Sequence, residues 1–209
     1  MTRIYGVRYE CGGRSGQEAY GLQKKISRWL QEEVFLREGI VPEEAFRIQY
    51  TSHGKPILEK KIGGQWRRSP LQYNLTHCSG LVCCGLGPGD LGLDAEPVRP
   101  YDSRLAARVC TRKELADIQA AQNPGERFIA YWTLKESLVK FLGVGLSYGL
   151  NRAVFSFQGA QPCCESHPRL RMRQTRIQRA DNSCYLALCQ EGGASAAFPD
   201  IQYLQPAFL

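Results

Sequence analysis

Apolar residues recur along the first half of this chain with two different periods. Between Gln17 and about Leu36, apolar side chains return every three or four positions, and this spacing predicts a long amphipathic helix. Short apolar runs bounded by turn-forming residues are typical of β-strands. Such runs predict strands at Ile4 to Tyr9, Phe46 to Tyr50, Leu71 to His77, Gly80 to Gly85 and Leu91 to Glu96.

The second half opens with predicted helices whose ends carry capping residues. Two prolines lie between Glu96 and Tyr101, where the predicted elements change from mainly strands to mainly helices. Helices are predicted at Ser103 to Cys110 and at Thr111 to Ala121, where Glu114 follows Thr111 at the spacing of a capping box. The pattern therefore changes from a strand-rich half to a helix-rich stretch, without a segment long or polar enough to form a flexible linker.

A further helix is predicted between Asn123 and Gly143. Asn123 is a good N-cap residue, Pro124 suits the first helical position, and Gly143 has the residue type that commonly ends helices. Three predicted strands follow this helix, at Ala153 to Phe157, Leu170 to Gln174 and Cys184 to Cys189.

Each half thus combines helical material with about three strands, which favours an α+β fold over regular βαβ alternation. We expect two tightly packed α+β halves, residues 1–98 and 99–209, each with a mainly antiparallel sheet and a long helix. The halves show no sequence repeat, so periodicity gives no sign of a duplicated architecture.

Composition indicates a folded chain that stays in the cytoplasm. The 209 residues are 43% hydrophobic, enough for one large core or two small ones. No run approaches the roughly 20 apolar residues of a membrane-spanning helix, and the first residues lack the apolar stretch of a signal peptide. The nine cysteines are odd in number and include no Cys-x-x-Cys spacing, so we expect reduced thiols rather than a zinc or disulfide framework.

The formal net charge of +7 favours a polyanionic partner. Nucleic acid, an anionic membrane face, a phosphorylated cofactor and an acidic protein all fit this charge. The basic residues are scattered in ones and twos, which argues against nucleic acid. The arginine-rich run from Arg169 to Arg179 alternates like a strand, and its simplest interpretation is a solvated face.

Two carboxylates are paired at the end of the predicted strand Leu91 to Glu96. Asp94 and Glu96 are two residues apart, so the strand period directs both side chains to one face. Leu91, Leu93 and Ala95 occupy the other face and place the acids near a core. Two neighbouring negative charges in a partly desolvated place repel one another unless a cation lies between them.

The predicted helix that begins after Asn123 carries a further acid, Glu136, and a lysine, Lys140, one turn apart. Trp132, Glu136 and Lys140 recur at every fourth position and so form one stripe, whereas the packing stripe is apolar. Asp94, Glu96 and Glu136 would offer a metal only oxygen ligands, which is the preference of magnesium. The simpler alternatives are an exposed acidic pair on a strand and a surface ion pair between Glu136 and Lys140.

Four motifs in the same order resemble those of the 4′-phosphopantetheinyl transferases of the surfactin type. Gly92-Leu93-Asp94-Ala95-Glu96 is similar to their Gly-hydrophobic-Asp-x-Glu motif, and the nine residues Trp-Thr-Leu-Lys-Glu-Ser-Leu-Val-Lys from 132 to 140 are similar to their Trp-x-x-Lys-Glu-(Ser/Ala)-x-x-Lys motif. Upstream, Gly54-Lys55-Pro56 resembles a Gly-Lys-Pro turn, and residues 73–79 resemble a Phe-Asn-(Ile/Leu)-Ser-His-Ser segment. The resemblance implies two α+β halves related by a pseudo-twofold axis, with the active site at their junction.

The resemblance also implies a role for each matching residue. Asp94, Glu96 and Glu136 match the magnesium ligands, and Lys140 matches the lysine that contacts the coenzyme A diphosphate. Glu136 is in addition the family's candidate for removing the proton of the acceptor serine, so Glu136 and Lys140 are the candidate catalytic residues.

Coenzyme A itself is expected to bind residues of the first half. The residues that match the turn holding the adenine nucleotide, with the preceding histidine included, are His53, Gly54, Lys55 and Pro56. Thr76 and His77 match the Ser-His pair near the 3′-phosphate. A hydroxyl, an imidazole and lysines are all suitable donors to phosphate oxygens.

The implied reaction moves phosphopantetheine from coenzyme A to a serine of an acyl or peptidyl carrier protein. Such carriers are acidic around the modified serine, so a basic monomeric enzyme gains encounter rate from complementary charge. The carrier's pathway, whether fatty acid, polyketide or nonribosomal peptide synthesis, is left open. Three rivals are a basic nucleic-acid-binding module, another magnesium-dependent phosphoryl-transfer enzyme, which would lack a P-loop motif, and a non-catalytic scaffolding relative. We expect neither nucleic acid nor a membrane as a partner.

Overall fold

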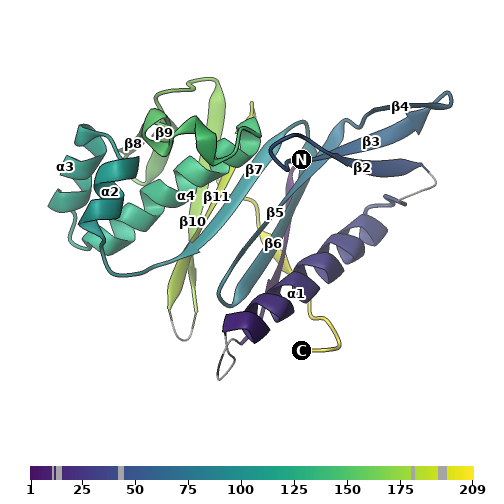
Figure 1. The fold of residues 1–209 in the computed structure, drawn as a ribbon, viewed down its shortest axis with the longest axis horizontal. Coiled ribbons are helices and arrows are strands. Elements are labelled where there is room, and N and C mark those ends of the chain that lie inside the picture. The colour runs from purple at the N-terminus through teal and green to yellow at the C-terminus, as the bar shows by residue number, and fades with distance from the viewer. Residues whose placement is uncertain (11, 13–15, 42–44, 180–181, 193–196) are drawn as a thin grey trace. The chain divides into compact units, whose positions relative to one another are not determined.

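The computed structural model describes residues 1–10, 12, 16–41, 45–179, 182–192 and 197–209. These residues form two compact units (Figure 1). The first comprises residues 1–91 together with 199–209, and the second comprises residues 92–198. Each unit is described separately below.

The first unit is built on a four-stranded sheet with one long helix. In the sheet, β12 (Ile201–Tyr203), β1 (Arg3–Arg8), β6 (Leu81–Pro88) and β5 (Leu71–Cys78) are neighbours in that order. The pairs β1–β6 and β5–β6 are antiparallel, whereas β12 runs parallel to β1. The helix α1 (Gly16–Arg37) buries Ile26, Leu30, Val34 and Phe35 in the core of this unit.

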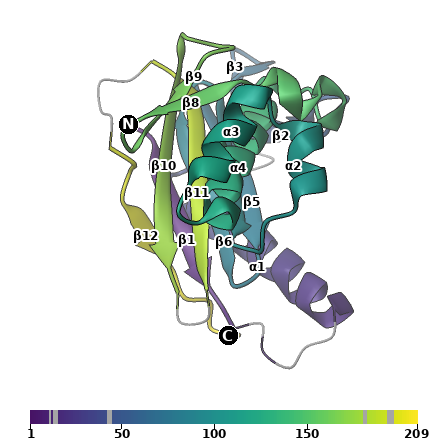
Figure 2. The same ribbon diagram turned by 90° about the vertical axis from the view of Figure 1, so that its left-hand side faces the viewer.

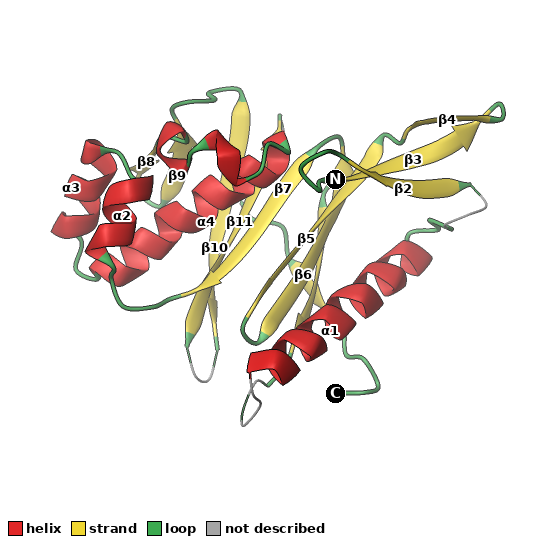
Figure 3. Ribbon diagram, viewed as in Figure 1, coloured by secondary structure: helices red, strands yellow, loops and turns green. Residues whose placement is uncertain are grey.

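A second, smaller sheet in the first unit contains β2 (Phe46–Tyr50), β3 (Pro56–Ile62) and β4 (Gln65–Arg68), all antiparallel (Figure 3). The side chain of Gln72 joins β3 to β5. Its amide accepts a hydrogen bond from the backbone N–H of Leu58 at 3.0 Å and donates to the Leu58 carbonyl at 2.9 Å. Because Gln72 is buried, these bonds satisfy a polar group that would otherwise be costly to desolvate.

The second unit packs three helices with two sheets. The helices are α2 (Ser103–Val109), α3 (Arg112–Ala120) and α4 (Pro124–Leu142). One sheet contains β10 (Leu170–Gln178), β11 (Ser183–Glu191) and β7 (Leu91–Pro97), and the other contains β8 (Phe155–Gln158) and β9 (Gln161–Cys164). Two short 3-10 helices, η1 (Leu146–Tyr148) and η2 (Leu150–Arg152), precede β8. Figures 1 and 2 show α4 lying along β11, which it contacts.

The predicted helix ends in this unit are confirmed. The Asn123 side chain accepts from the backbone N–H of Glu126, Pro124 takes the first helical position, and Gly143 closes α4 in the left-handed conformation at φ 68°. In α3, Thr111 and Glu114 form both bonds of the capping box. These helix ends are predictable from the sequence because the free backbone groups at a helix end are hydrogen-bonded by residues within one turn.

The predicted α+β class with mainly antiparallel sheets is confirmed, and each unit pairs its main sheet with one long helix. The sequence analysis did not predict β3, β4, β9 or β12. β12 has only three residues and pairs with a strand almost two hundred positions away in the sequence, so no local sequence pattern predicts it. The division of the chain at residue 98 remains a proposal. β7, which lies before residue 98, shares its sheet with β10 and β11, and the last eleven residues belong to the first unit.

Eight cysteines lie among the described residues, and all carry thiols rather than disulfide bonds; Cys11 lies outside the described residues. Most of them are buried, as expected of small apolar side chains. Within the same described ranges, no helix is both long and apolar enough to cross a membrane.

Candidate active site

Gly92 allows the backbones of β7 and α4 to touch. A Cβ atom at this position would lie 1.9 Å from the Ser137 carbonyl oxygen and 2.4 Å from the Phe141 nitrogen, far inside van der Waals contact. Only glycine therefore permits this approach. Because side chains alternate along a strand, Asp94 and Glu96 share the face of Gly92 and are directed toward α4.

Lys140 of α4 is bound to β7 by two contacts. Its Nζ donates to Asp94 Oδ1 at 2.7 Å and to the Leu93 carbonyl oxygen at 3.1 Å. The Asp94 side chain is only 7% exposed, so its charge is largely removed from water. The ammonium supplies the opposite charge that a buried carboxylate requires.

Glu136 lies one turn before Lys140, and its environment raises the pKa of its carboxyl to about 7. Burial is the largest cause, followed by repulsion from Asp94, while Lys140 opposes the shift and Glu96 adds to it. The pKa of Glu96 is also raised, first by burial and then by Asp94. Each acid therefore lies within electrostatic reach of the other two.

Trp132, Glu136 and Lys140 form the partly exposed stripe of α4, as predicted, whereas Tyr131, Leu134, Leu138 and Phe141 are buried. Lys135, the lysine directly before Glu136 in the motif, has a different position. Its side chain is fully buried and bonded to Glu114, so it lies in the packing of the unit rather than on the stripe. The sequence analysis gave Lys135 no role, and its burial identifies it as a structural residue.

The donors around Lys140 suit a hard divalent cation, because carboxylate oxygens are the ligands that magnesium prefers. Three acids in mutual repulsion at a partly buried place also gain from a shared cation. Across the described ranges, no group of three or more His, Cys, Asp or Glu side chains is already gathered closely enough to hold a metal ion. The ligand set Asp94, Glu96 and Glu136 therefore stays a prediction.

Two further residues adjoin Glu96. The Arg99 guanidinium lies 3.9 Å from Glu96 Oε2 and 5.7 Å from the ring centre of Trp132. The Trp132 indole lies close enough to the Glu96 carboxyl that hydrogen bonding from it lowers the pKa of Glu96, against the larger effect of burial. The sequence analysis missed Arg99, for which the only signal was its place three residues after Glu96.

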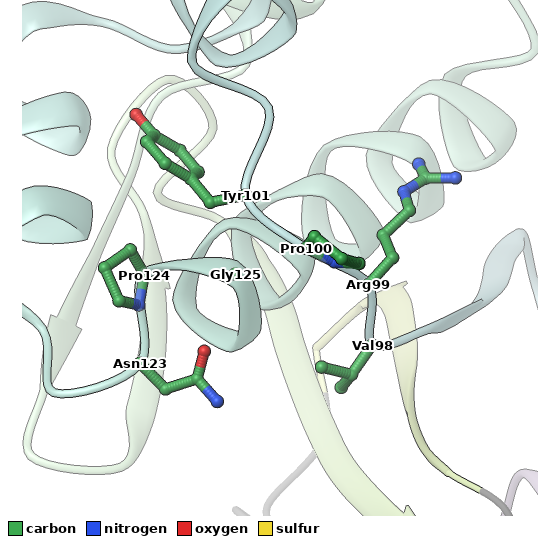
Figure 4. A pocket seen from close by; sticks show the side chains of 7 residues that line it. All are labelled: Val98, Arg99, Pro100, Tyr101, Asn123, Pro124 and Gly125. Carbon is green, nitrogen blue, oxygen red and sulfur yellow. The ribbon is translucent and has the colours of Figure 1, made fainter.

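Arg99 also lines a pocket of about 470 Å³ between the segment Val98 to Tyr101 and the first turn of α4 (Figure 4). In Figure 4 the Arg99 side chain points away from Asn123 and Pro124. The pocket walls are mainly apolar side chains and backbone, and Gly125 lets the Arg99 carbonyl pass closely, since a Cβ there would lie 2.6 Å from that oxygen. None of the predicted site residues lines this pocket.

The predicted nucleotide-binding turn belongs to the first unit. Gly54 has φ 80° and its N–H donates to the Thr51 carbonyl at 2.9 Å, so a tight turn precedes β3. His53 is exposed, and Pro56 begins β3 opposite Tyr50. The Lys55 side chain is 8% exposed and its Nζ donates to Asp90 Oδ1 at 2.7 Å.

Thr76 and His77 lie on opposite faces of β5. Thr76 is buried and paired with Cys83, whereas His77 is exposed and paired with Val82. Adjacent strand residues alternate between faces, so the two side chains cannot point to one group from the same side of the sheet. The structure thus brings together Asp94, Glu96, Glu136 and Lys140 within the second unit and separates Thr76 from His77.

A family model described as the 4′-phosphopantetheinyl transferase superfamily matches residues 90–196, a little over half of the chain. The matched region contains β7 and α4 with all four of the clustered residues. The chain therefore belongs to the 4′-phosphopantetheinyl transferase superfamily.

Several curated relatives are named as phosphopantetheinyl transferases. The chain is 28% identical over 146 residues to the 4′-phosphopantetheinyl transferase psf-1 of Bacillus pumilus, covering 66% of this chain and 59% of the relative. It is 29% identical over 169 residues to the L-aminoadipate-semialdehyde dehydrogenase-phosphopantetheinyl transferase of Rattus norvegicus, covering 74% and 54%. The matches span about half the length of these relatives.

Among solved structures, the holo-[acyl-carrier-protein] synthase of Thermotoga maritima resembles part of the chain. The TM-score is 0.40 at 18% identity, covering 49% of this chain and 64% of that structure. A likeness this loose carries no argument about function.

Proposed function

We propose that this chain is a magnesium-dependent 4′-phosphopantetheinyl transferase that modifies a serine of an acidic acyl or peptidyl carrier protein. The observation that carries the proposal is the cluster of three carboxylates and one lysine on β7 and α4, inside the region that matches the superfamily. Magnesium held by Asp94, Glu96 and Glu136 would neutralise the diphosphate of coenzyme A.

In this reaction the serine oxygen forms a bond to the β-phosphorus of coenzyme A. The bond from that phosphorus to the bridging oxygen breaks, and adenosine 3′,5′-bisphosphate leaves with the electron pair. The serine proton passes to a base. Glu136 is proposed as this base because it lies on α4 one turn before Lys140, in the same cluster of charges as Asp94 and Glu96.

Lys140 is proposed to stabilise the negative charge of the departing nucleotide. A lysine ammonium is a compact point charge on a flexible stem, which suits phosphate oxygens. Its position one turn from Glu136 on α4 would place both charges on one side of the reacting phosphate. Catalysis then rests on positioning and on cancelling charge, as in other phosphoryl transfers.

Coenzyme A is proposed to use residues of the first unit for its nucleotide end. These residues are His53, Gly54, Lys55, Pro56, Thr76 and His77. In the proposed complex Lys55 exchanges its bond to Asp90 for a phosphate oxygen, and the exposed imidazole of His77 is the more accessible donor of the Thr76–His77 pair. The net charge of +7 supports an acidic carrier, and the eight described thiols support a cytoplasmic location. A working monomer is proposed because one chain carries both the Asp94–Glu96 motif and the Glu136–Lys140 motif.

The proposal is tested by incubating the purified chain with coenzyme A, magnesium and an apo carrier protein. One phosphopantetheine should be added to the carrier, seen by mass spectrometry as a single increase in mass. Glu136→Ala and Asp94→Ala should abolish the increase without unfolding the protein. Glu32→Gln, which changes an exposed acid on α1, is the matched control and should keep full activity. Full activity of both site variants would show that the assignment of the site is wrong.

A further inference from the structure

Lys140 is bound to Asp94, one of the predicted magnesium ligands. Its Nζ contacts two oxygens of β7, the Asp94 carboxylate at 2.7 Å and the Leu93 carbonyl at 3.1 Å. The lysine comes from α4, and Gly92 holds that helix against the same strand. The chain therefore places one of its own cations on a predicted magnesium ligand.

This internal ion pair has a clear physical cause. The Asp94 side chain is 7% exposed and the Lys140 side chain 31%, so the carboxylate is the more deeply buried partner. An isolated charge at such a depth is costly, and a nearby opposite charge offsets that cost. Lys140 supplies this opposite charge.

We propose that Lys140 is the resident counterion of Asp94 and that an incoming divalent cation displaces it, releasing the ammonium to the diphosphate of coenzyme A. This inference rests on the proposed transferase function. A divalent cation on Asp94 repels the ammonium with twice the force of a single charge at the same distance. The four-carbon stem of lysine allows the ammonium to move while the helix stays in place.

The exchange makes the binding of metal and of coenzyme A cooperative. Metal binding alone must break the Lys140–Asp94 ion pair, which weakens the affinity for the metal. When the diphosphate is present, the released ammonium gains a new partner, so the metal binds more tightly. By linkage, the metal strengthens the binding of coenzyme A by the same factor.

The test measures Mn²⁺ binding to the purified full chain, with free Mn²⁺ followed by electron paramagnetic resonance. Lys140→Met keeps an unbranched side chain, one atom shorter than that of lysine, and removes its charge. In the absence of coenzyme A, this variant should bind Mn²⁺ on the order of tenfold more tightly than the original chain, a typical coupling between two sites. Lys140→Arg retains a cation beside Asp94 and should bind Mn²⁺ no more tightly than the original.

Lys113→Met is the matched control for the change in net charge. Lys113 is an exposed lysine of the same unit, 77% exposed and paired with Glu165, so its loss should leave Mn²⁺ affinity unchanged. Equal or weaker Mn²⁺ binding by Lys140→Met, in protein whose circular dichroism shows a native fold, would overturn the inference. Equal tightening by Lys113→Met would also overturn it, because net charge alone would then explain the effect.

Adding coenzyme A distinguishes this inference from the proposed function. In the original chain, coenzyme A should tighten Mn²⁺ binding, and in Lys140→Met this additional tightening should be lost. If coenzyme A has no effect on the original chain while Lys140→Met alone still binds Mn²⁺ more tightly, the counterion role stands. The delivery of Lys140 to the diphosphate is then refuted, together with the proposed use of coenzyme A.

Discussion

Replacing Lys135 with methionine should strongly destabilise the second unit, because the substitution leaves a buried carboxylate without its cation. The side chains of Lys135 and Glu114 are both completely buried. Lys135 Nζ donates to both Glu114 oxygens at 2.9 Å, to the Leu150 carbonyl at 3.2 Å and to the Ala153 carbonyl. These bonds connect α3 and α4 to η2 and to Ala153, the residue that follows η2.

The expected cost follows from what the substitution leaves behind. Removing one partner of a buried ion pair typically costs about 3–5 kcal/mol. For a chain of this size, each kcal/mol lowers the melting temperature by about 2–4 °C, so we expect a fall of roughly 6–20 °C. Glu114 also accepts from the backbone N–H groups of Thr111 at 2.7 Å and Phe155 at 2.9 Å, so an uncompensated Glu114 disturbs these bonds as well.

Urea unfolding followed by circular dichroism measures the free energy of unfolding directly. The matched control, Lys113→Met, replaces an exposed lysine of the neighbouring helix α3 and should change stability by no more than about 0.5 kcal/mol. The double variant Lys135→Met/Glu114→Gln removes both charges. It should cost about 0.5–3 kcal/mol less than the sum of its single substitutions, because neither buried charge remains.

Two results would refute this reasoning. A cost below about 1 kcal/mol for Lys135→Met would mean that the pair contributes little to stability. A variant with unchanged stability and no transferase activity would place Lys135 in the chemistry of the site rather than in the packing of the unit.

Two other predictions concern the contact between β7 and α4 and the acid sensitivity of α3. Gly92→Ala should lower both the stability of the fold and its affinity for Mn²⁺, because a Cβ atom 1.9 Å from the Ser137 carbonyl oxygen must push β7 away from α4, which carries Glu136. Thermal unfolding and metal titration measure the two effects, and unchanged values would contradict the close contact. The pKa of Asp117 lies below its ordinary 3.8, chiefly because the Arg127 guanidinium donates to its carboxylate, despite burial, and Tyr131 adds a second bond. The folded state thus favours the charged form of Asp117, which stabilises the fold. This stabilisation is fully present above the pKa of Asp117 in the unfolded chain and is lost as the pH falls through its lower pKa in the folded state. Asp117→Asn should therefore lose less stability than the original chain between about pH 5 and pH 2 in urea titrations, and parallel curves would show that Asp117 makes no such contribution.

Much of the local structure was predictable because its causes are local. The ends of α4 follow from Asn123, Pro124 and Gly143, whose effects act within a single turn. The shared face of Asp94 and Glu96 follows from the strand period alone. The same rule already separates Thr76 from His77, so their different exposure needed no tertiary information.

The helices, most of the strands and the shared face of the acids are predictable from the sequence, since each depends on neighbours in the chain. The pairing of charges depends instead on the packing of elements that are far apart in the chain. Lys135 and Lys140 are five residues apart on α4, yet Lys135 is buried in an ion pair with Glu114 and Lys140 is bound to Asp94. Which partner each lysine meets depends on how closely β7 and α3 approach α4, and those distances are set by the packing of whole elements, with Gly92 as the point of closest contact.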